Sequence, residues 1–131
     1  MPDTDSLTFY ATHGVITDPR EQAHLLDGLP ADLPGLARVV QGLLLHPLEA
    51  DLYGVDLTRL QRKEVYIRAV SEMLERVHRL DARPLAEPRE PGERLVGNCR
   101  DHAVLLCAML RHQGRPARVR AGFATYLDTA L

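Results

Sequence analysis

The feature that most constrains the fold is a continuous apolar run from Ala103 to Leu110 that lies between two polar ends. Asn98 precedes the run and is a good N-cap, while Gly114 follows it with Pro116 just beyond, so the spacing predicts one helix. A helix that is apolar on every side is buried in the middle of a domain. The rest of the chain is therefore expected to fold around this helix.

Length and composition fit one soluble domain. The chain has 131 residues, of which 45% are hydrophobic and 26% are charged, and this excludes wholesale disorder. No apolar stretch approaches the roughly 20 residues of a membrane helix, and the polar N-terminus lacks the basic and apolar parts of a secretory signal. Sixteen Lys and Arg against eighteen Asp and Glu leave no basic field for nucleic acid or an anionic membrane. We expect a cytoplasmic protein with neither of those partners.

The two cysteines, Cys99 and Cys107, are too few for a disulfide scaffold. On one helix they lie about 12 Å apart along the axis. A disulfide needs Cα atoms within about 7 Å, so two free thiols are expected, as in a reducing cytoplasm.

The chain up to residue 82 is predicted to be mostly helical, after a possible short strand at residues 7–11. Asp18 is a good N-cap, with Pro19 at the first helical position and Gly28 as the stop. This part reads as a helical scaffold.

Two further helices are predicted in the same region. The first runs from about Leu33 to Leu45, because apolar residues recur at helical spacing on one face. The second begins at a capping box formed by Thr58 and Gln61 and reaches about Leu80. Its expected apolar stripe is Tyr66, Val70, Met73, Val77 and Leu80. The segment 48–57 between them is ambiguous.

Residues 83–94 are rich in proline, with Pro84, Pro88 and Pro91 lying among charged residues. Neither a helix nor a central strand tolerates this spacing of prolines. We predict a surface loop that leads into the cysteine helix.

If Asn98 is the N-cap, Cys99 is the first residue of the helix. Unpaired N–H groups and the helix macrodipole put positive potential there, which favours the nucleophilic thiolate and can help to hold an oxyanion. Gly97 is expected to let a substrate backbone approach closely. Position alone leaves Cys99 equally compatible with a small buried hydrophobe. Cys107, inside the apolar run, is expected to pack in the core.

After the helix, residues 117–127 alternate between apolar and polar side chains. This period is typical of a strand with one face on the core. The strand is predicted to pack on the cysteine helix and to begin a sheet.

The order of these motifs resembles the core of the transglutaminase-like superfamily. Cys99 is followed by Asp101, the apolar helix, an Arg-x-x-Gly-x-Pro-Ala-Arg segment that starts at Arg111, and then Gly122-Phe123. The resemblance covers about residues 95–127, and the helical region before it also looks like the lead-in of bacterial transglutaminase-like domain proteins. It implies an α+β, papain-like architecture in which the cysteine helix packs on an antiparallel sheet.

The resemblance also implies a chemistry. Cys99 would attack an amide or ester carbonyl of a peptide or small amide and form a thioester, which water or an amine would resolve, with Asn98 and Asp101 in support. Asp101 is expected to bond the backbone or a neighbouring arginine. No metal or other cofactor is implied.

The family's general base is a histidine on a later strand, and an aspartate on the next strand orients it. The sequence ends before either, because Asp128 comes too early to match. We expect residues 1–131 to be one incomplete transglutaminase-like domain that is inactive in isolation. Its parts are a helical lead-in (1–82), a Pro-rich loop (83–94), and the cysteine helix with the following strand (95–131).

Other hypotheses stay open. The chain is also compatible with a non-catalytic binding or scaffolding module that keeps the fold and interacts through the helices between Asp18 and Leu80. Cys99-x-x-His102 is half of a zinc site, but no second pair with suitable spacing exists. His102 as a base would be unusual, because substrate must reach the sulfur from beyond the helix end.

The remaining basic residues have less specific expectations. The other histidines carry no local signature and are expected at the surface or at caps: His13, His24, His46, His78 and His112. Four arginines after the apolar run either recognise an acidic group or form a solvated edge: Arg111, Arg115, Arg118 and Arg120.

Overall fold

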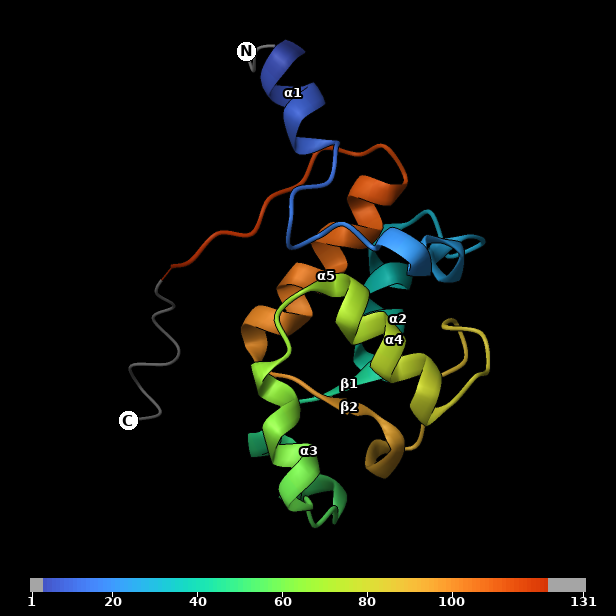
Figure 1. Cartoon of the computed structure of the whole chain (residues 1–131), viewed down its shortest axis with the longest axis vertical. Coiled ribbons are helices and arrows are strands. Elements are labelled where there is room, and N and C mark those ends of the chain that lie inside the picture. Colours follow the sequence, from blue (N-terminus) through green and yellow to red (C-terminus); the bar gives the residue numbers. More distant parts are fainter. Residues whose placement is uncertain (1–3, 123–131) are drawn as a thin grey trace.

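The computed structural model describes residues 4–122, which form short helices around a two-stranded sheet (Figure 1). With η marking a 3-10 helix, the helices are α1 (Thr4–Tyr10), η1 (Arg20–Leu26), α2 (Leu33–Leu43), η2 (Pro47–Glu49), η3 (Asp51–Tyr53), α3 (Arg59–Lys63), η4 (Glu64–Tyr66), α4 (Val70–Leu80), η5 (Pro91–Glu93) and α5 (Cys99–His112). The strands are β1 (Leu44–Leu45) and β2 (Leu95–Val96). None of these helices has the length and hydropathy needed to cross a membrane.

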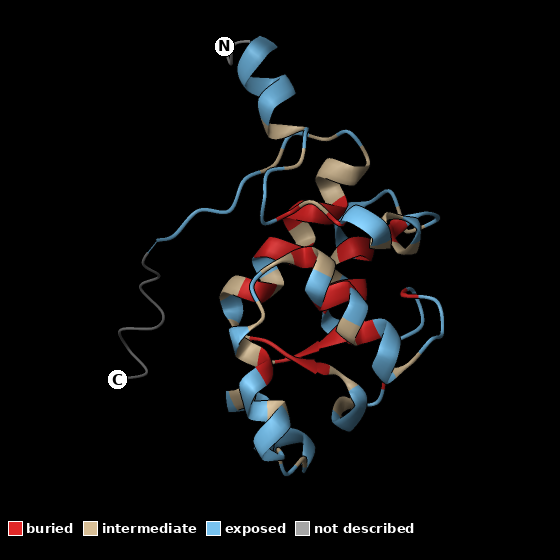
Figure 2. Cartoon of the chain, in the orientation of Figure 1, coloured by how far each residue is buried: buried red, intermediate tan, exposed pale blue. Residues whose placement is uncertain are grey.

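The core lies where α2, α4 and α5 meet the two strands, and Figure 2 shows the buried residues concentrated there. The residues that α5 contributes are Val104, Leu105, Ala108 and Met109. Burying an aliphatic side chain of this size contributes about 1.5–3 kcal/mol, so this helix anchors the fold as the sequence predicts.

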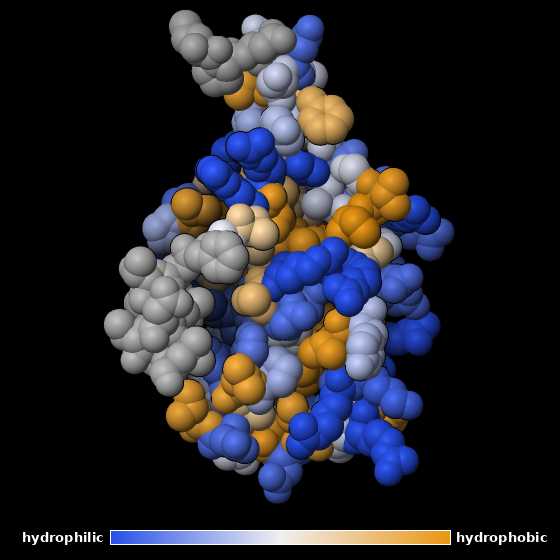
Figure 3. All heavy atoms as spheres, turned by 90° about the vertical axis from the view of Figure 1, so that its left-hand side faces the viewer, coloured by the Kyte–Doolittle hydropathy of each residue, from blue (hydrophilic) through white to orange (hydrophobic). Residues whose placement is uncertain are grey.

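The burial of α5 is nevertheless one-sided, which corrects the prediction of a helix enclosed all round. Ala103 is exposed, and Leu106 and Leu110 are only half-buried. Figure 3 looks from the left-hand side of Figure 1, where the N-terminal end of α5 lies, and hydrophobic residues are visible there among hydrophilic ones. Within residues 4–122 the neighbouring elements cover only the core-facing side of this helix.

The sheet is parallel, with Leu44 opposite Leu95 and Leu45 opposite Val96. All four residues are buried, as expected for a parallel pair that is covered on both faces. The mixed α+β class is therefore confirmed. The described residues contain no antiparallel sheet, because β1 and β2 run in the same direction.

The predicted strand at 117–127 is wrong for its described part, since residues 117–122 adopt no strand. Residues 123–127 lie outside the described residues. The N–H of Ala117 donates to the carbonyl oxygen of Tyr10 at 3.0 Å. Val119 is 43% exposed. The sequence of this segment alternates as a strand would, but among residues 4–122 no strand lies beside it to pair with it.

The N-terminal predictions also need correction. Residues 7–11 lie largely in α1 and not in a strand, because a helix satisfies its own backbone hydrogen bonds where no neighbouring strand is available. The carboxylate of Asp18 accepts a hydrogen bond from the N–H of Arg20 at 2.9 Å, but the helix starts at Arg20 and is a 3-10 helix. The next helix, α2, ends at Leu43, because the two following residues pair with β2.

The predicted long helix is broken. The capping box of Thr58 and Gln61 is confirmed, but the helix that it starts is α3, which passes into η4 and stops before α4. Val70, Met73 and Val77 are buried as predicted, whereas Tyr66 and Leu80 are exposed. The ambiguous segment 48–57 contains the 3-10 turns η2 and η3.

Candidate active site

Cys99 is the first residue of α5 and is exposed at the surface. The side-chain oxygen of Asn98 accepts a hydrogen bond from the N–H of Asp101 at 3.1 Å. In return, the Asp101 carboxylate accepts one from the N–H of Asn98 at 2.9 Å. This reciprocal capping box confirms the predicted N-cap. It fixes the backbone on both sides of the sulfur-bearing residue.

The second cysteine lies in a different environment. Cys107 is buried in the apolar part of α5, and burial raises the pKa of its thiol. Its predicted core role is confirmed. The chain thus offers one accessible thiol and one enclosed thiol on the same helix.

Gly97 makes room for the protein and not for a substrate. A Cβ placed on Gly97 would lie 3.1 Å from the Cβ of Asp101 and 3.6 Å from a methyl group of Leu44. Gly97 itself is buried. The expectation that a substrate backbone approaches this glycine is therefore wrong, because the capping residue Asp101 packs over it.

Asp101 is 2% exposed and also lies 3.6 Å from the guanidinium of Arg100. The prediction that it bonds the backbone or a neighbouring arginine is confirmed for the backbone, whereas the approach to Arg100 is an ion pair without a hydrogen bond. Because its carboxylate sits at the N-terminal end of α5, it also complements the helix macrodipole.

His102 lies one turn after Cys99, and its Nδ1 is 2.8 Å from the carbonyl oxygen of Asn98. A carbonyl oxygen only accepts hydrogen bonds, so in the neutral ring Nδ1 carries the proton and Nε2 is left as an acceptor. The ring of His46 lies 6.4 Å away, centroid to centroid. Its Nδ1 accepts a hydrogen bond from the N–H of Leu48 at 3.1 Å, so its proton is on Nε2. The backbone thus assigns opposite tautomers to the two rings.

A cavity of about 590 Å³ opens beside His102. Its polar lining comes from α2, the η2–η3 segment, the loop before β2, and α5: Arg38, Gln41, Glu49, Tyr53, Arg94 and His102. His102 thus belongs both to the helix turn that carries Cys99 and to the cavity wall.

The sequence model of the transglutaminase-like superfamily matches residues 56–129. The chain belongs to the transglutaminase-like superfamily. The match covers more than half of the chain and begins before α3, earlier than the resemblance at about 95–127. No curated protein and no solved structure matches the chain.

Within this transglutaminase-like domain, Glu64 is a buried residue that the sequence pattern did not single out. It is 5% exposed. One carboxylate oxygen lies 2.9 Å from Nε of Arg76, and the other accepts a hydrogen bond from the N–H of Val96 at 3.0 Å. Glu64 thereby ties η4 and α4 to the strand that leads into the cysteine helix. Glu64 lies in the helix predicted from Thr58 to about Leu80, whose charged residues were expected to face solvent. The sequence therefore carried no signal that Glu64 is buried.

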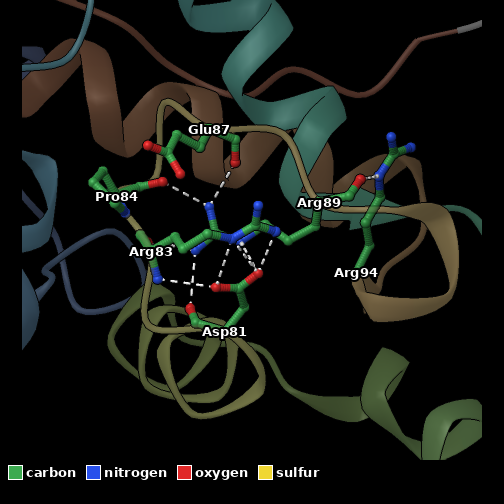
Figure 4. A network of polar contacts seen from close by, with 6 residues as sticks. All are labelled: Asp81, Arg83, Pro84, Glu87, Arg89 and Arg94. Carbon is green, nitrogen blue, oxygen red and sulfur yellow. Dashed lines mark hydrogen bonds and ion pairs between the residues drawn. The ribbon is translucent and has the colours of Figure 1, made fainter.

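The Pro-rich loop of the domain is built around a buried arginine, which corrects the prediction of a plain surface loop. Arg89 is 2% exposed. Its Nη1 donates to the carbonyl oxygens of Pro84 and Glu87, both at 2.8 Å, and its Nη2 donates to those of Asp81 and Arg83. Figure 4 shows the Arg89 side chain running through the middle of the loop between these acceptors. Because the prolines prevent regular structure, a guanidinium satisfies the carbonyl groups instead.

The other predicted groups do not assemble into a second site. Among residues 4–122, no three His, Cys, Asp or Glu side chains lie close enough to hold a metal ion. Arg111 donates to the carbonyl oxygen of Ala117 and to the Thr17 hydroxyl. Arg118 lies over the ring of Tyr10. Two of the four arginines are thus held by the protein itself.

Four of the five histidines expected at surfaces and caps have specific partners, and the fifth, His78, is exposed on α4. His46 caps η2, and Nδ1 of His24 lies 3.1 Å from the carbonyl oxygen of Glu21. Nε2 of His112 lies 3.0 Å from the carboxylate of Asp27, and its ring stacks on that of His13. Burial lowers the pKa of His13.

Proposed function

We propose that this transglutaminase-like domain carries cysteine-dependent acyl-transfer chemistry with Cys99 as the nucleophile. The observation that carries the proposal is the place of Cys99, exposed at the first position of α5 inside the matched region. The first N–H groups of a helix have no intrahelical partner. The capping box uses those of Asn98 and Asp101, which leaves the N–H groups of Cys99 and Arg100 for an oxyanion formed beside the sulfur. The substrate class is a peptide or small amide, and the two free thiols fit a reducing cytoplasm.

The chemistry proceeds in two steps. The Cys99 thiolate forms a bond to the carbonyl carbon, the carbon–nitrogen bond breaks, and the amine leaves after taking up a proton, so that a thioester remains. Water or a second amine then attacks the thioester carbonyl and loses a proton. The thiolate is released, and the product is an acid or a new amide.

Turnover needs a base that the family supplies elsewhere. The superfamily resemblance places the general base and its orienting aspartate on strands after the segment 117–127, and no residue of the 131 matches them. His102 offers an acceptor nitrogen one turn from Cys99, but among residues 4–122 its ring is hydrogen-bonded to the carbonyl oxygen of Asn98 and not to the sulfur. We expect the 131-residue chain to be acylated on Cys99 and to turn over little.

Selective alkylation tests the nucleophile. The 131-residue chain is treated with iodoacetamide at pH 7, and each cysteine is followed by peptide mass spectrometry. We expect Cys99 to react faster than Cys107, because Cys99 is exposed at the end of α5 whereas Cys107 is buried. Equally slow labelling of both cysteines overturns the proposal. The Cys107→Ala variant should leave the Cys99 rate unchanged.

The alternative, a non-catalytic binding module, has one observation in its favour. Leu48 and Leu52, in η2 and η3, are each 83% exposed, and Leu60 on α3 is also exposed. These leucines lie within the region expected to contact a partner. Sedimentation velocity separates the hypotheses. A binding module that assembles through these leucines loses the assembly in a Leu48→Ser, Leu52→Ser variant, whereas Cys99 labelling is unaffected.

A further inference from the structure

Arg94 is held in one orientation at the wall of the 590 Å³ cavity. Its Nε donates a hydrogen bond to the carbonyl oxygen of Arg89 at 2.8 Å, and its guanidinium carbon lies 5.7 Å from the centre of the Tyr53 ring. Its two terminal nitrogens have no hydrogen-bond partner within residues 4–122. A guanidinium that is already oriented loses little conformational entropy when it binds a planar anion.

The loop that presents Arg94 is itself anchored. The N–H of Arg89 donates to the carbonyl oxygen of Gly42 at 3.0 Å, which attaches the loop to the end of α2. A Cβ on Gly42 would lie 3.0 Å from Pro88, so the loop and the helix approach as closely as a glycine permits. The buried Arg89 guanidinium holds the loop from within (Figure 4). These contacts give Arg94 a rigid support.

The charge of the cavity favours an anion. Arg38 lies on α2, in the same cavity wall, and Gln41 and Tyr53 add neutral polar groups. The charged residues of the cavity wall besides His102 are two arginines and one carboxylate, Glu49. The chain as a whole has a net charge of −2, so the positive charge of the cavity wall is opposite in sign to that of the whole chain.

We propose that this cavity binds the carboxylate of an acidic residue in a peptide substrate. The inference rests on the proposed function. It deepens that function by assigning a subsite one helix turn from Cys99, at His102. His102, which lines the cavity, follows Cys99 by three residues, a rise of about 4.5 Å along the helix. A peptide whose amide acylates Cys99 can therefore place a nearby side chain in the cavity. Arg94 would donate from its terminal nitrogens to the carboxylate, and Arg38 would add a second positive charge.

Direct binding, without turnover, tests the subsite. The Cys99→Ser chain is titrated by calorimetry with acetyl-Ala-Gln-Glu-amide and with its neutral counterpart acetyl-Ala-Gln-Gln-amide. We expect the acidic peptide to bind roughly tenfold more tightly, with an advantage that falls as salt is raised. Arg94→Gln and Arg38→Gln should each remove most of this preference. Arg94→Lys, which keeps the charge but loses the planar donor pair, should give an intermediate value.

Two further variants sharpen the result. Glu49→Gln should increase the affinity for the acidic peptide, because it removes the one carboxylate of the cavity wall. Arg68→Gln is the matched control, since Arg68 is an exposed arginine outside the cavity and should leave the preference unchanged. Circular dichroism confirms that each variant is folded.

The outcomes separate this inference from the proposed function. Equal binding of the two peptides, or a preference that survives both arginine variants, overturns the subsite while leaving Cys99 chemistry untouched. Inorganic phosphate that binds as tightly as the acidic peptide also overturns it, because the cavity is then a general anion site. Selective peptide binding in a chain whose Cys99 resists acylation supports the subsite and counts against the enzyme.

Discussion

The carboxylate of Glu64 accepts a hydrogen bond from the backbone N–H of Val96 at 3.0 Å, deep inside the domain. The same carboxylate pairs with Arg76 on α4. Val96 is also the last residue of β2, which leads through Gly97 and Asn98 into the helix that carries Cys99. One side chain from η4 therefore helps to set where the cysteine helix starts.

Replacing Glu64 is expected to cost stability. Glu64→Gln keeps the shape but weakens a charge-assisted pair, and Glu64→Ala leaves the N–H of Val96 unpaired, so we expect losses of about 1 and about 3 kcal/mol in the free energy of unfolding. Urea denaturation followed by circular dichroism measures both. Glu72→Gln, at an exposed position of α4, serves as the control and should change stability by less than about 0.5 kcal/mol. Equal effects at the two positions would contradict the role assigned to Glu64.

The capping box of α5 is expected to support both stability and reactivity. Asn98→Ala removes the acceptor for the N–H of Asp101 and should cost about 1 kcal/mol. It should also slow alkylation of Cys99, because the first turn loses its fixed geometry. Thr58→Ala breaks the other capping box, at exposed α3, and tests specificity. Thr58→Ala should leave the alkylation rate of Cys99 unchanged. If it slows alkylation as Asn98→Ala does, the effect of Asn98 on Cys99 is not specific to the cap of α5.

Arg89 is expected to be irreplaceable by lysine. A lysine keeps the positive charge, but its single ammonium group cannot reach the four carbonyl oxygens that the guanidinium satisfies. We expect Arg89→Lys to cost about 2 kcal/mol or more in the free energy of unfolding. Arg79→Lys, on the exposed face of α4, is the matched control. If both substitutions are equally mild, the loop does not depend on the buried guanidinium.

His13 gives the domain a pH dependence near neutrality. Burial lowers its pKa below 6.5 in the folded chain, and Arg111 and the stacked His112 lower it further, while Asp18 acts against them. The unfolded chain then binds more protons than the folded chain around pH 6, so this contribution to stability is complete above pH 6.5 and is lost as the pH falls toward the folded pKa.

Thermal melting between pH 7.5 and 5.5 measures the effect of His13. His13→Gln should flatten the fall in melting temperature, because it removes the titrating ring. His78→Gln, at an exposed position, should not. A fall that is unchanged in His13→Gln would assign the pH dependence to other groups.

The sequence predicted the features that local chemistry decides. The Asn98 cap, the start of α5 at Cys99, the capping box of Thr58 and Gln61, and the burial of Cys107 depend on neighbours a few residues apart, and all are confirmed. Spacing and capping chemistry are read directly from such stretches.

What the sequence could not predict are contacts between distant segments. The pairing of β1 with β2 joins Leu44 to Leu95, and nothing in either two-residue strand indicates a partner. Glu64 and Arg89 look like ordinary surface charges until the fold brings Val96 and the loop carbonyls to them. The wall of the cavity likewise gathers Arg38, Arg94 and His102 from separate elements.

Acylation of Cys99 tests directly whether this residue is the nucleophile. The 131-residue chain is mixed with p-nitrophenyl acetate, and p-nitrophenol release is followed while intact mass and peptide mapping locate the acetyl group. We expect a burst of about one equivalent, an acetyl thioester on Cys99, slow turnover afterwards, and no burst in Cys99→Ala. A chain without a burst, or one whose burst survives Cys99→Ala, would contradict the assignment of Cys99 as the nucleophile.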